Sequence, residues 1–483
     1  MRDLAFLAYL LALFGLGFRR PFLLVLVYVY IDIVAPQRLT YYLLNALPIS
    51  LIAVLLAVGG WLLADDKRGL RIAPRQLMIV GLLIYCGLTT LTADFPLEAR
   101  DKWDWVWKAL AFAAFLPLTL RTRLRIEALL TFMILSASSI IIVGGIKTLA
   151  SGGGYGELNL MVDNNSGIYE GSTISTVAVA ILPLIAWVAR YGTIFRTRPP
   201  FVPSEVVGSP GASTALGTNG RTTNREAGKW RERAIWTFCL ALGFACLLIP
   251  IGTSTRTGLL CIGLVAVLSL RTAKRKVLWL SLMAAGALVA VPFLPSAFTE
   301  RMSTIKTYKA DESASTRLAV WQWTWNFAKE HPFGGGFDAY RQNRIVYELA
   351  DEAGPESSGA GRLAIDKARA YHSAYFEMLG EQGYPGLALW LLINVAGLWR
   401  MEVLRRRCRA GEYAWAGSLA GALQTAQLVY LLGAAFIAIA FQPFIYMLIG
   451  AQIGLDGYLK KRREAGESRG FRRVAAMASP LTA

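Results

Sequence analysis

Residues 375–398 read YFEMLGEQGYPGLALWLLINVAGL, and the second half of this stretch is an almost unbroken apolar run. Long apolar runs are typical of membrane-spanning helices, because a bilayer core of roughly 30 Å requires about 20 apolar residues per helix. The whole chain has the same character, with 55% hydrophobic residues and a mean hydropathy of +0.44. The sequence therefore predicts an all-α polytopic membrane protein.

Similar apolar runs recur along the chain and predict thirteen spans, or twelve to fourteen in all, because several are short. The predicted spans are Leu4–Phe18, Pro21–Ala35, Tyr42–Ala64, Leu77–Ala93, Trp105–Leu120, Ile126–Leu149, Ser172–Val188, Ile235–Ile251, Thr257–Leu270, Val277–Leu294, Tyr375–Leu398, Ser418–Ala440 and Phe441–Leu459. The five cysteines are scattered, and we interpret them as small buried hydrophobic residues.

The formal net charge is +18, and the basic clusters fall in every second loop between the predicted spans. By the positive-inside rule these loops are cytoplasmic, so the N-terminus is expected outside and the C-terminus inside. Nucleic-acid binding is the rival explanation for so basic a chain. We disfavour nucleic-acid binding, because the basic clusters are dispersed among the loops between membrane spans, where the positive-inside rule explains them.

The spans and loops divide the chain into four parts. Two loops are long: a cytoplasmic one, rich in Gly, Ser, Thr and Asn and predicted to be disordered, and an outer one with several tryptophans, predicted to be mainly helical. The predicted parts are N-terminal transmembrane helices in 1–294 with the disordered loop at about 193–230, a large periplasmic loop in 295–371, C-terminal transmembrane helices in 372–459, and a cytoplasmic tail in 460–483.

Two short outer turns carry polar residues suited to binding. YGELNLMVDNNSG contains Asn164 and Asn165, which fit either a turn and helix cap or a functional site. IPIGTSTRTGLL contains Arg256 among hydroxyl side chains. Basic residues favour the cytoplasmic side of a membrane, and Arg256 is predicted to lie on the outer side. It is therefore either an interfacial residue or a bidentate anion ligand.

The outer loop supplies two further arginines. Arg317 and Trp321 share a helix face, and Arg341 follows the glycines of HPFGGG by five residues. The helix from Ser315 to Lys329 should end at this glycine turn. The loop is near neutral, with ten basic and ten acidic residues from Glu300 to Arg369, so its arginines are not part of a general basic coat.

The segment that enters the quoted span carries one of only two histidines in the chain. His372 precedes Glu377 and Glu381, which share a helix face at the start of the span. Ionisable residues at membrane depth are costly and usually face an internal cavity. The GYPG sequence at Gly383–Gly386 should kink this helix or delay its start.

The order of these motifs resembles the bacterial O-antigen ligase and polymerase superfamily. The order is an Asn-rich turn, an S/T-x-R turn, a D-x-S-x-S-x-R-x-x-x-W helix ending in HPFGGG, and H-S-A-Y-x-E-x-L-G-E-Q-G-Y-P-G-L. The chain is most similar to the O-glycosylation ligases associated with exosortase A systems. The resemblance implies a multi-pass protein of the bacterial inner membrane that transfers a glycan from undecaprenyl diphosphate to an acceptor hydroxyl of a glycan, lipid or protein.

Carried onto this sequence, the resemblance implies His372 as the catalytic residue and Arg256, Arg317 and Arg341 as diphosphate ligands, without a metal or other cofactor. Glu377, Glu381, Asn164, Asn165 and Trp321 would support the site. Histidine suits a general base near neutral pH, and fixed arginines suit an anionic leaving group. Two alternatives remain, a polysaccharide polymerase of the same superfamily and a lipid-glycan transporter or flippase.

Overall fold

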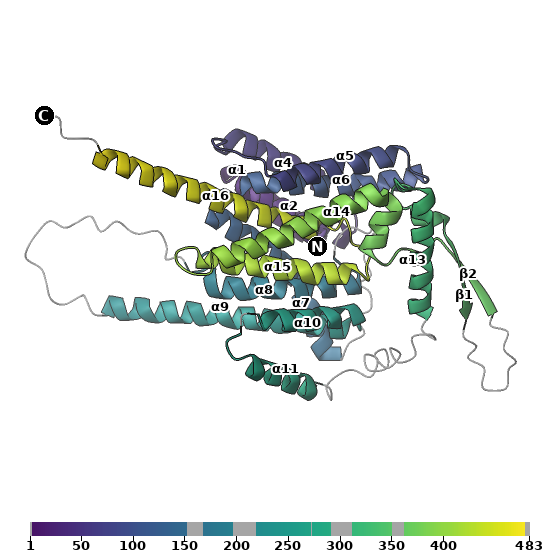
Figure 1. Ribbon diagram of the computed structural model, residues 1–483. Helices are drawn as coiled ribbons and strands as arrows, with labels where there is room; N and C mark the ends of the chain where they lie inside the picture. Colours follow the sequence, from purple (N-terminus) through teal and green to yellow (C-terminus); the bar gives the residue numbers. More distant parts are fainter. Residues whose placement is uncertain are drawn as a thin grey trace, which may run out of the picture.

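The computed structural model describes residues 2–151, 168–196, 219–271, 273–290, 312–349 and 362–478. Most of these residues are helical (Figure 1). The helices are α1 (Arg2–Arg19), α2 (Phe22–Val34), α3 (Pro36–Leu39), α4 (Ile49–Ala64), α5 (Pro74–Leu91), α6 (Pro96–Thr119), α7 (Arg123–Ser151), α8 (Gly171–Tyr191), α9 (Asn219–Gly252), α10 (Arg256–Ser269), α11 (Lys276–Ala290), α13 (Glu312–Glu330), α14 (Ala374–Arg407), α15 (Ala414–Ala434) and α16 (Pro443–Ala478).

The prediction of an all-α polytopic membrane protein is confirmed. Each of the thirteen predicted spans overlaps one helix, with α3 and α13 falling outside them. Among the described residues, five helices are long and apolar enough to cross a membrane by length and composition, namely α5, α7, α8, α9 and α14. Four shorter helices are also apolar: α2, α4, α10 and α11.

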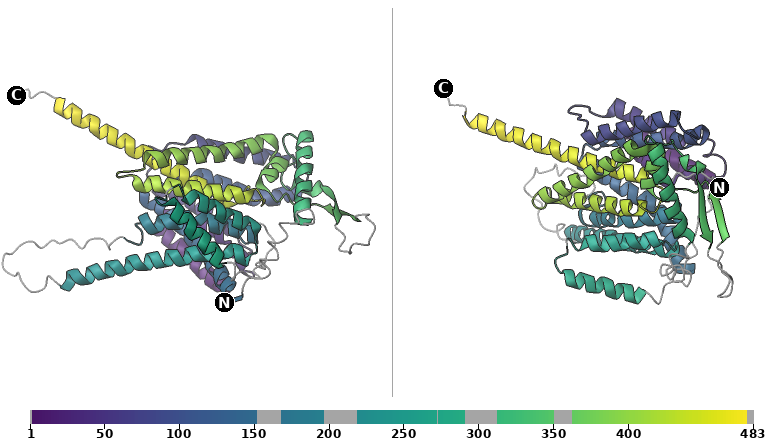
Figure 2. Two further views of the ribbon diagram at one scale, coloured as in Figure 1. Left: turned by 60° about the horizontal axis from the view of Figure 1, so that its bottom comes forward. Right: turned by 45° about the vertical axis from the view of Figure 1, so that its right-hand side comes forward.

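The bundle has two distinct ends. Helix α13 lies across one end, with β1 and β2 beyond it, and we call this the cap end (Figures 1 and 2). The N-terminal part of α9 and the C-terminal part of α16 extend from the opposite end. Between the ends, α8 packs against α15 and α9, and α14 packs against α5 and α15.

The basic clusters that are far apart in the sequence gather at the end opposite the cap, which we call the basic end. Ion pairs join them there: Arg125 to Asp65 at 2.5 Å, Arg271 to Glu402 at 2.9 Å, and Arg71 to Glu464 at 2.6 Å. These pairs connect the loop after α4 with the start of α7 and with α16, and the loop after α10 with α14. The alternation of charge along the chain therefore corresponds to a division between two ends of the bundle.

Two features differ from the sequence prediction. The outer loop contains an antiparallel hairpin of β1 (Arg344–Leu349) and β2 (Arg362–Lys367), with Arg344 opposite Lys367, after the short 3-10 helix η3 (Ala339–Gln342). Its segments RIVYEL and RLAIDK contain β-branched and aromatic residues (Ile345, Val346, Tyr347 and Ile365), which favour strands and were a usable signal.

The predicted disordered loop at 193–230 is wrong for its last twelve positions, because α9 begins at Asn219. From Arg225 the sequence reads REAGKWRERA, in which Arg, Glu, Ala and Lys are good helix formers. An established apolar helix propagates into such a segment at low cost, because nucleation is already complete. Residues 197–218 of the predicted loop lie outside the described residues.

Candidate active site at the cap end

The site is built around a break near the start of α14. Gly383 has φ 64° and ψ −166° inside the helix, which confirms the kink predicted from GYPG. The glycines of the HPFGGG turn pack directly against this break. A Cβ atom at Gly334 would lie 2.4 Å from the carbonyl oxygen of Glu381, and one at Gly383 would lie 2.3 Å from that of Pro332. The glycines thus permit contact between two backbone segments.

Backbone hydrogen bonds join the turn to the break. The N–H groups of Gly335 and Gly336 donate to the carbonyl oxygens of Gly380 and Glu381, both at 3.0 Å, and the Tyr384 N–H donates to Pro332 at 2.9 Å. The broken turn of α14 therefore has its carbonyl groups satisfied by the outer loop. This attachment holds the end of α13 on the membrane-spanning bundle.

A buried ion cluster reinforces the attachment; it consists of Lys102, Asp338, Glu377 and Glu381. The Lys102 ammonium on α6 lies 2.8 Å from Glu377 Oε1, 2.7 Å from Glu381 Oε1 and 3.9 Å from Asp338 Oδ1. The Glu381 side chain is fully buried. Burying charges costs several kcal/mol per ion unless they are paired with good geometry.

The two glutamate carboxylates of this cluster also accept backbone hydrogen bonds. The Ala440 N–H donates to Glu377 Oε2 at 2.9 Å, and the Asp338 N–H donates to Glu381 Oε1 at 3.0 Å. The cluster thus connects α6, α14, the outer loop and the segment before α16. Glu377 and Glu381 share a helix face as predicted, and that face is directed at Lys102.

His372 lies just before α14, on a backbone of unusual conformation. Its φ is +48°, in the left-handed region that side chains other than glycine rarely adopt. The Trp321 indole N–H donates to the carbonyl oxygen of Tyr371 at 2.9 Å, and its ring stacks on Phe376 with centroids 5.0 Å apart. Trp321 thereby contacts the chain on both sides of His372, through the Tyr371 backbone and the Phe376 ring, so α13 positions the histidine.

The electrostatic surroundings of His372 keep it neutral. Burial lowers its pKa below the usual 6.5, and the positive charges of Arg317 and Arg369 lower it further, while Glu170 opposes them. The side chain is half-buried. A histidine that stays uncharged near neutral pH can accept a proton. The structure thus brings together Arg317 and His372, which are both predicted site residues.

Arg256 is the first residue of α10 and lies at the cap end of α8. The Thr255 hydroxyl donates to Ser175 Oγ at 3.0 Å, and Ser175 also lies 2.7 Å from Thr253 Oγ1. Ser175 is in the second turn of α8, whose N-cap is Glu170. The two threonine hydroxyls therefore pack against α8, and the half-buried Arg256 follows them at the same end of the bundle as Glu170 and His372.

The structure places Arg341 elsewhere. Its guanidinium lies 3.6 Å from Glu98 Oε1 and 3.7 Å from Asp338 Oδ2, beside the ion cluster. It is not among the groups that shift the pKa of His372. Asn164 and Asn165 lie outside the described residues.

Sequence reasoning missed three charged residues here: Glu170, Arg369 and Lys102. Arg369 begins the RAYH segment three positions before His372 and pairs with Asp366 at 2.9 Å, so proximity to the histidine was a usable signal. Glu170 caps α8 by accepting from the Thr173 N–H at 2.9 Å, and an acidic residue at the start of an apolar run is a weaker signal of a helix start. Lys102 had no local signal.

The fold and the site define a class of protein, a multi-pass α-helical membrane protein with a histidine and arginines gathered at one end. Among the described residues no group of three or more His, Cys, Asp or Glu side chains is arranged to hold a metal ion. Residues 239–391 match the family model described as O-antigen ligase, which supports the resemblance to the O-antigen ligase superfamily.

The matched segment runs from α9 into α14, so it includes Arg256, the described outer loop and His372. Residues 1–193 match a family of unknown function, DUF5935. No curated protein matches the chain.

Proposed function

We propose that this chain is a glycosyltransferase of the bacterial inner membrane that transfers a glycan from undecaprenyl diphosphate to an acceptor hydroxyl on the periplasmic side. The observation that carries the proposal is a half-buried His372 with a lowered pKa, beside Arg317 and Arg369, within the part of the chain that matches the O-antigen ligase family. The acceptor is a hydroxyl of a glycan, lipid or protein. An association with exosortase A systems is part of this proposal.

In the proposed reaction, neutral His372 accepts the proton of the acceptor hydroxyl as its oxygen attacks the anomeric carbon of the donor sugar. The bond between that carbon and the phosphate oxygen breaks, and undecaprenyl diphosphate leaves with the bonding electrons. Arg317 and Arg256 stabilise the charge that develops on the diphosphate, with Arg369 as a further cation near the histidine. Arg341 keeps a lesser proposed role, because its guanidinium lies beside Glu98 and Asp338.

The distribution of basic loops supports a periplasmic position for the site. Basic loops are retained in the cytoplasm, and the described basic clusters gather at the end opposite the site. The cap end is then periplasmic. Reporter fusions after Arg125 and Arg407 should be cytoplasmic, whereas a fusion after Lys367 in the outer loop should be periplasmic. The reverse pattern would place the site on the wrong side for this donor.

The direct test is transfer by the purified protein in proteoliposomes with an undecaprenyl diphosphate-linked glycan. Release of undecaprenyl diphosphate together with a glycosylated acceptor supports the proposal, and chelation of divalent ions should leave the rate unchanged. Lengthening of the lipid-linked glycan itself would instead identify a polymerase. Movement of the donor across the bilayer without bond cleavage would identify a flippase.

A further inference from the structure

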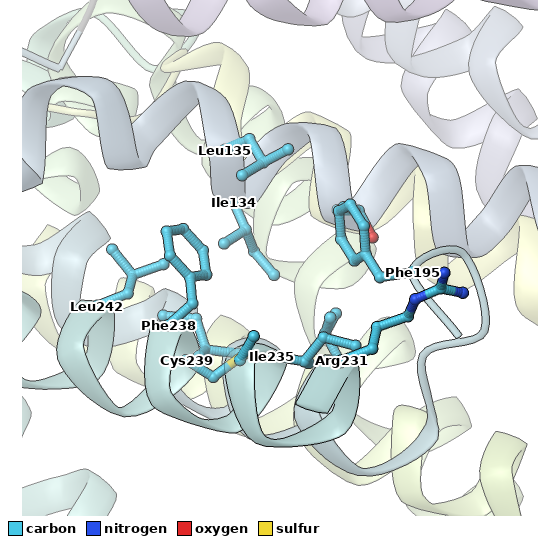
Figure 3. A pocket seen from close by; sticks show the side chains of 12 residues that line it. Ile134, Leu135, Phe195, Arg231, Ile235, Phe238, Cys239 and Leu242 are labelled. Carbon is cyan, nitrogen blue, oxygen red and sulfur yellow. The ribbon is translucent and has the colours of Figure 1, made fainter. Parts of the chain in front are cut away.

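A cavity lies between α7, α8 and α9, far from the candidate active site. Its volume is about 530 Å³, within the range of about 300–1,000 Å³ typical of small-molecule sites. Figure 3 shows its lining, with Ile134 and Leu135 of α7 on one side and Ile235, Phe238 and Cys239 of α9 on the other. The lining is apolar apart from Thr131 and Arg231.

The cavity faces the surroundings of the bundle. Phe195 and Phe238, which both line it, are each 46% exposed. Only 28% of the apolar part of α9 is buried inside the protein, so this helix lies at the rim of the bundle. In a bilayer, such exposed aromatic and aliphatic side chains contact acyl chains. A lipid chain can therefore enter the cavity from the side.

One end of the cavity is strongly cationic. Arg231 stands at that end near Phe195 (Figure 3), two residues into the apolar part of α9, which begins at Lys229. The described residues 190–196 and 229–233 contain Arg190, Arg196, Lys229, Arg231 and Arg233 against a single acid, Glu232. The Arg196 guanidinium donates to the Arg190 carbonyl at 2.9 Å at the end of α8. This mouth thus lies at the basic end.

We propose that this cavity binds one anionic phospholipid of the leaflet at the basic end, with an acyl chain between α7 and α9 and the phosphate against Arg231. The apolar lining accepts the chain, and the local excess of positive charge selects an anionic headgroup. Val188, which lines the cavity, is eighteen residues along α8 from Glu170, so the headgroup lies roughly 27 Å from the candidate active site. The site is therefore separate from the diphosphate site of the proposed function.

The experiment uses the full chain in nanodiscs of phosphatidylcholine, with a small fraction of phosphatidylglycerol that carries a photoreactive group in one acyl chain. After irradiation, mass spectrometry locates the labelled residues. We expect labelling of the segment 231–242 and its suppression by unlabelled phosphatidylglycerol. Equal labelling by a phosphatidylcholine probe would overturn the proposal, and so would suppression by undecaprenyl phosphate in preference to phosphatidylglycerol.

Two pairs of variants separate the headgroup contact from the acyl-chain contact. Arg231→Ala should reduce labelling about fivefold, whereas Arg233→Ala should reduce it less than about twofold, since Arg233 adds to the surrounding charge but does not line the cavity. Cys239→Trp should fill the cavity and abolish labelling, whereas Leu240→Trp should not, because Leu240 is exposed outside it. Equal labelling within either pair would refute the corresponding contact. Retained transfer activity would show that each variant is folded.

Discussion

The two sides of the start of α14 carry opposite excesses of charge. On one side, the charged groups that shift the pKa of His372 are two arginines and one glutamate. On the other side, the carboxylates of Asp338, Glu377 and Glu381 surround the single ammonium group of Lys102. Both groups of residues are held within a few turns of the same helix and contact the same outer loop.

The difference shows how one helix start can serve two purposes. The carboxylates of the ion cluster are paired with Lys102, and Glu377 and Glu381 also accept backbone hydrogen bonds, so their charges stabilise the attachment of the outer loop. The cationic side would attract an anionic leaving group, whereas the carboxylate-rich side would repel it. Carboxylates near a predicted catalytic histidine are therefore not necessarily its partners. The following predictions test this division, from the largest expected effect to the smallest.

Replacing the histidine should cause the largest loss of activity. A general base typically contributes about 10²–10⁴-fold, so His372→Ala should reduce the transfer rate by a factor in that range while donor binding is retained. Single-turnover transfer and donor binding are measured on the same purified variant. His331→Ala is the matched control and should transfer normally, because His331 is exposed and stacks on Phe327. Loss of donor binding in His372→Ala would make His372 a diphosphate ligand instead.

Removing the ammonium of the ion cluster should mainly affect stability. Lys102→Met leaves buried carboxylates without their partner, which typically costs about 3–5 kcal/mol. The variant should unfold at a markedly lower temperature in detergent, as measured by scanning fluorimetry. The double variant Lys102→Met with Glu381→Gln should recover part of the loss, because one buried charge is removed. Unchanged thermal stability of the single variant would mean that the cluster does not hold the loop.

The arginines on the two sides should respond differently to a change that keeps the charge. Arg317→Lys should lower kcat/KM about tenfold, because lysine cannot provide two parallel hydrogen bonds to a phosphate. Arg341→Lys should change kcat/KM less than about twofold, since exposed ion pairs such as those with Glu98 and Asp338 contribute little. Equal losses in the two variants would place Arg341 at the diphosphate.

The smallest predicted effect is a shift in the pH profile. Arg369 lowers the pKa of His372, so Arg369→Gln should raise that pKa. The neutral histidine is the active form, and its fraction falls as pH drops through the pKa. The acidic limb of the transfer profile should therefore move to higher pH. The rate on the alkaline side should fall only slightly, because Arg317 and Arg256 remain to stabilise the diphosphate. Arg344→Gln, an exposed arginine on β1, should leave the limb in place. A limb that does not move in Arg369→Gln would contradict the assignment of His372.

The sequence alone was enough to determine the class of fold and the local features of the site. The spans follow from apolar length, the kink at Gly383 from GYPG, and helix α13 from its composition and the glycine turn that ends it. The resemblance to the superfamily, too, could be recognised from the order of motifs, and the match of residues 239–391 supports it. All of these depend on residues close together in the chain.

Only the tertiary structure decided which charges meet. Lys102 and Glu381 are 279 residues apart, and their contact depends on how α6 packs beside α14. The position of Glu170 also depends on how whole helices pack. So does the contact between the glycines of HPFGGG and the break in α14. Hydrophobicity and periodicity specify each helix separately, because they are properties of neighbouring residues. The partner of a buried charge depends instead on the packing of whole helices, which no local pattern records.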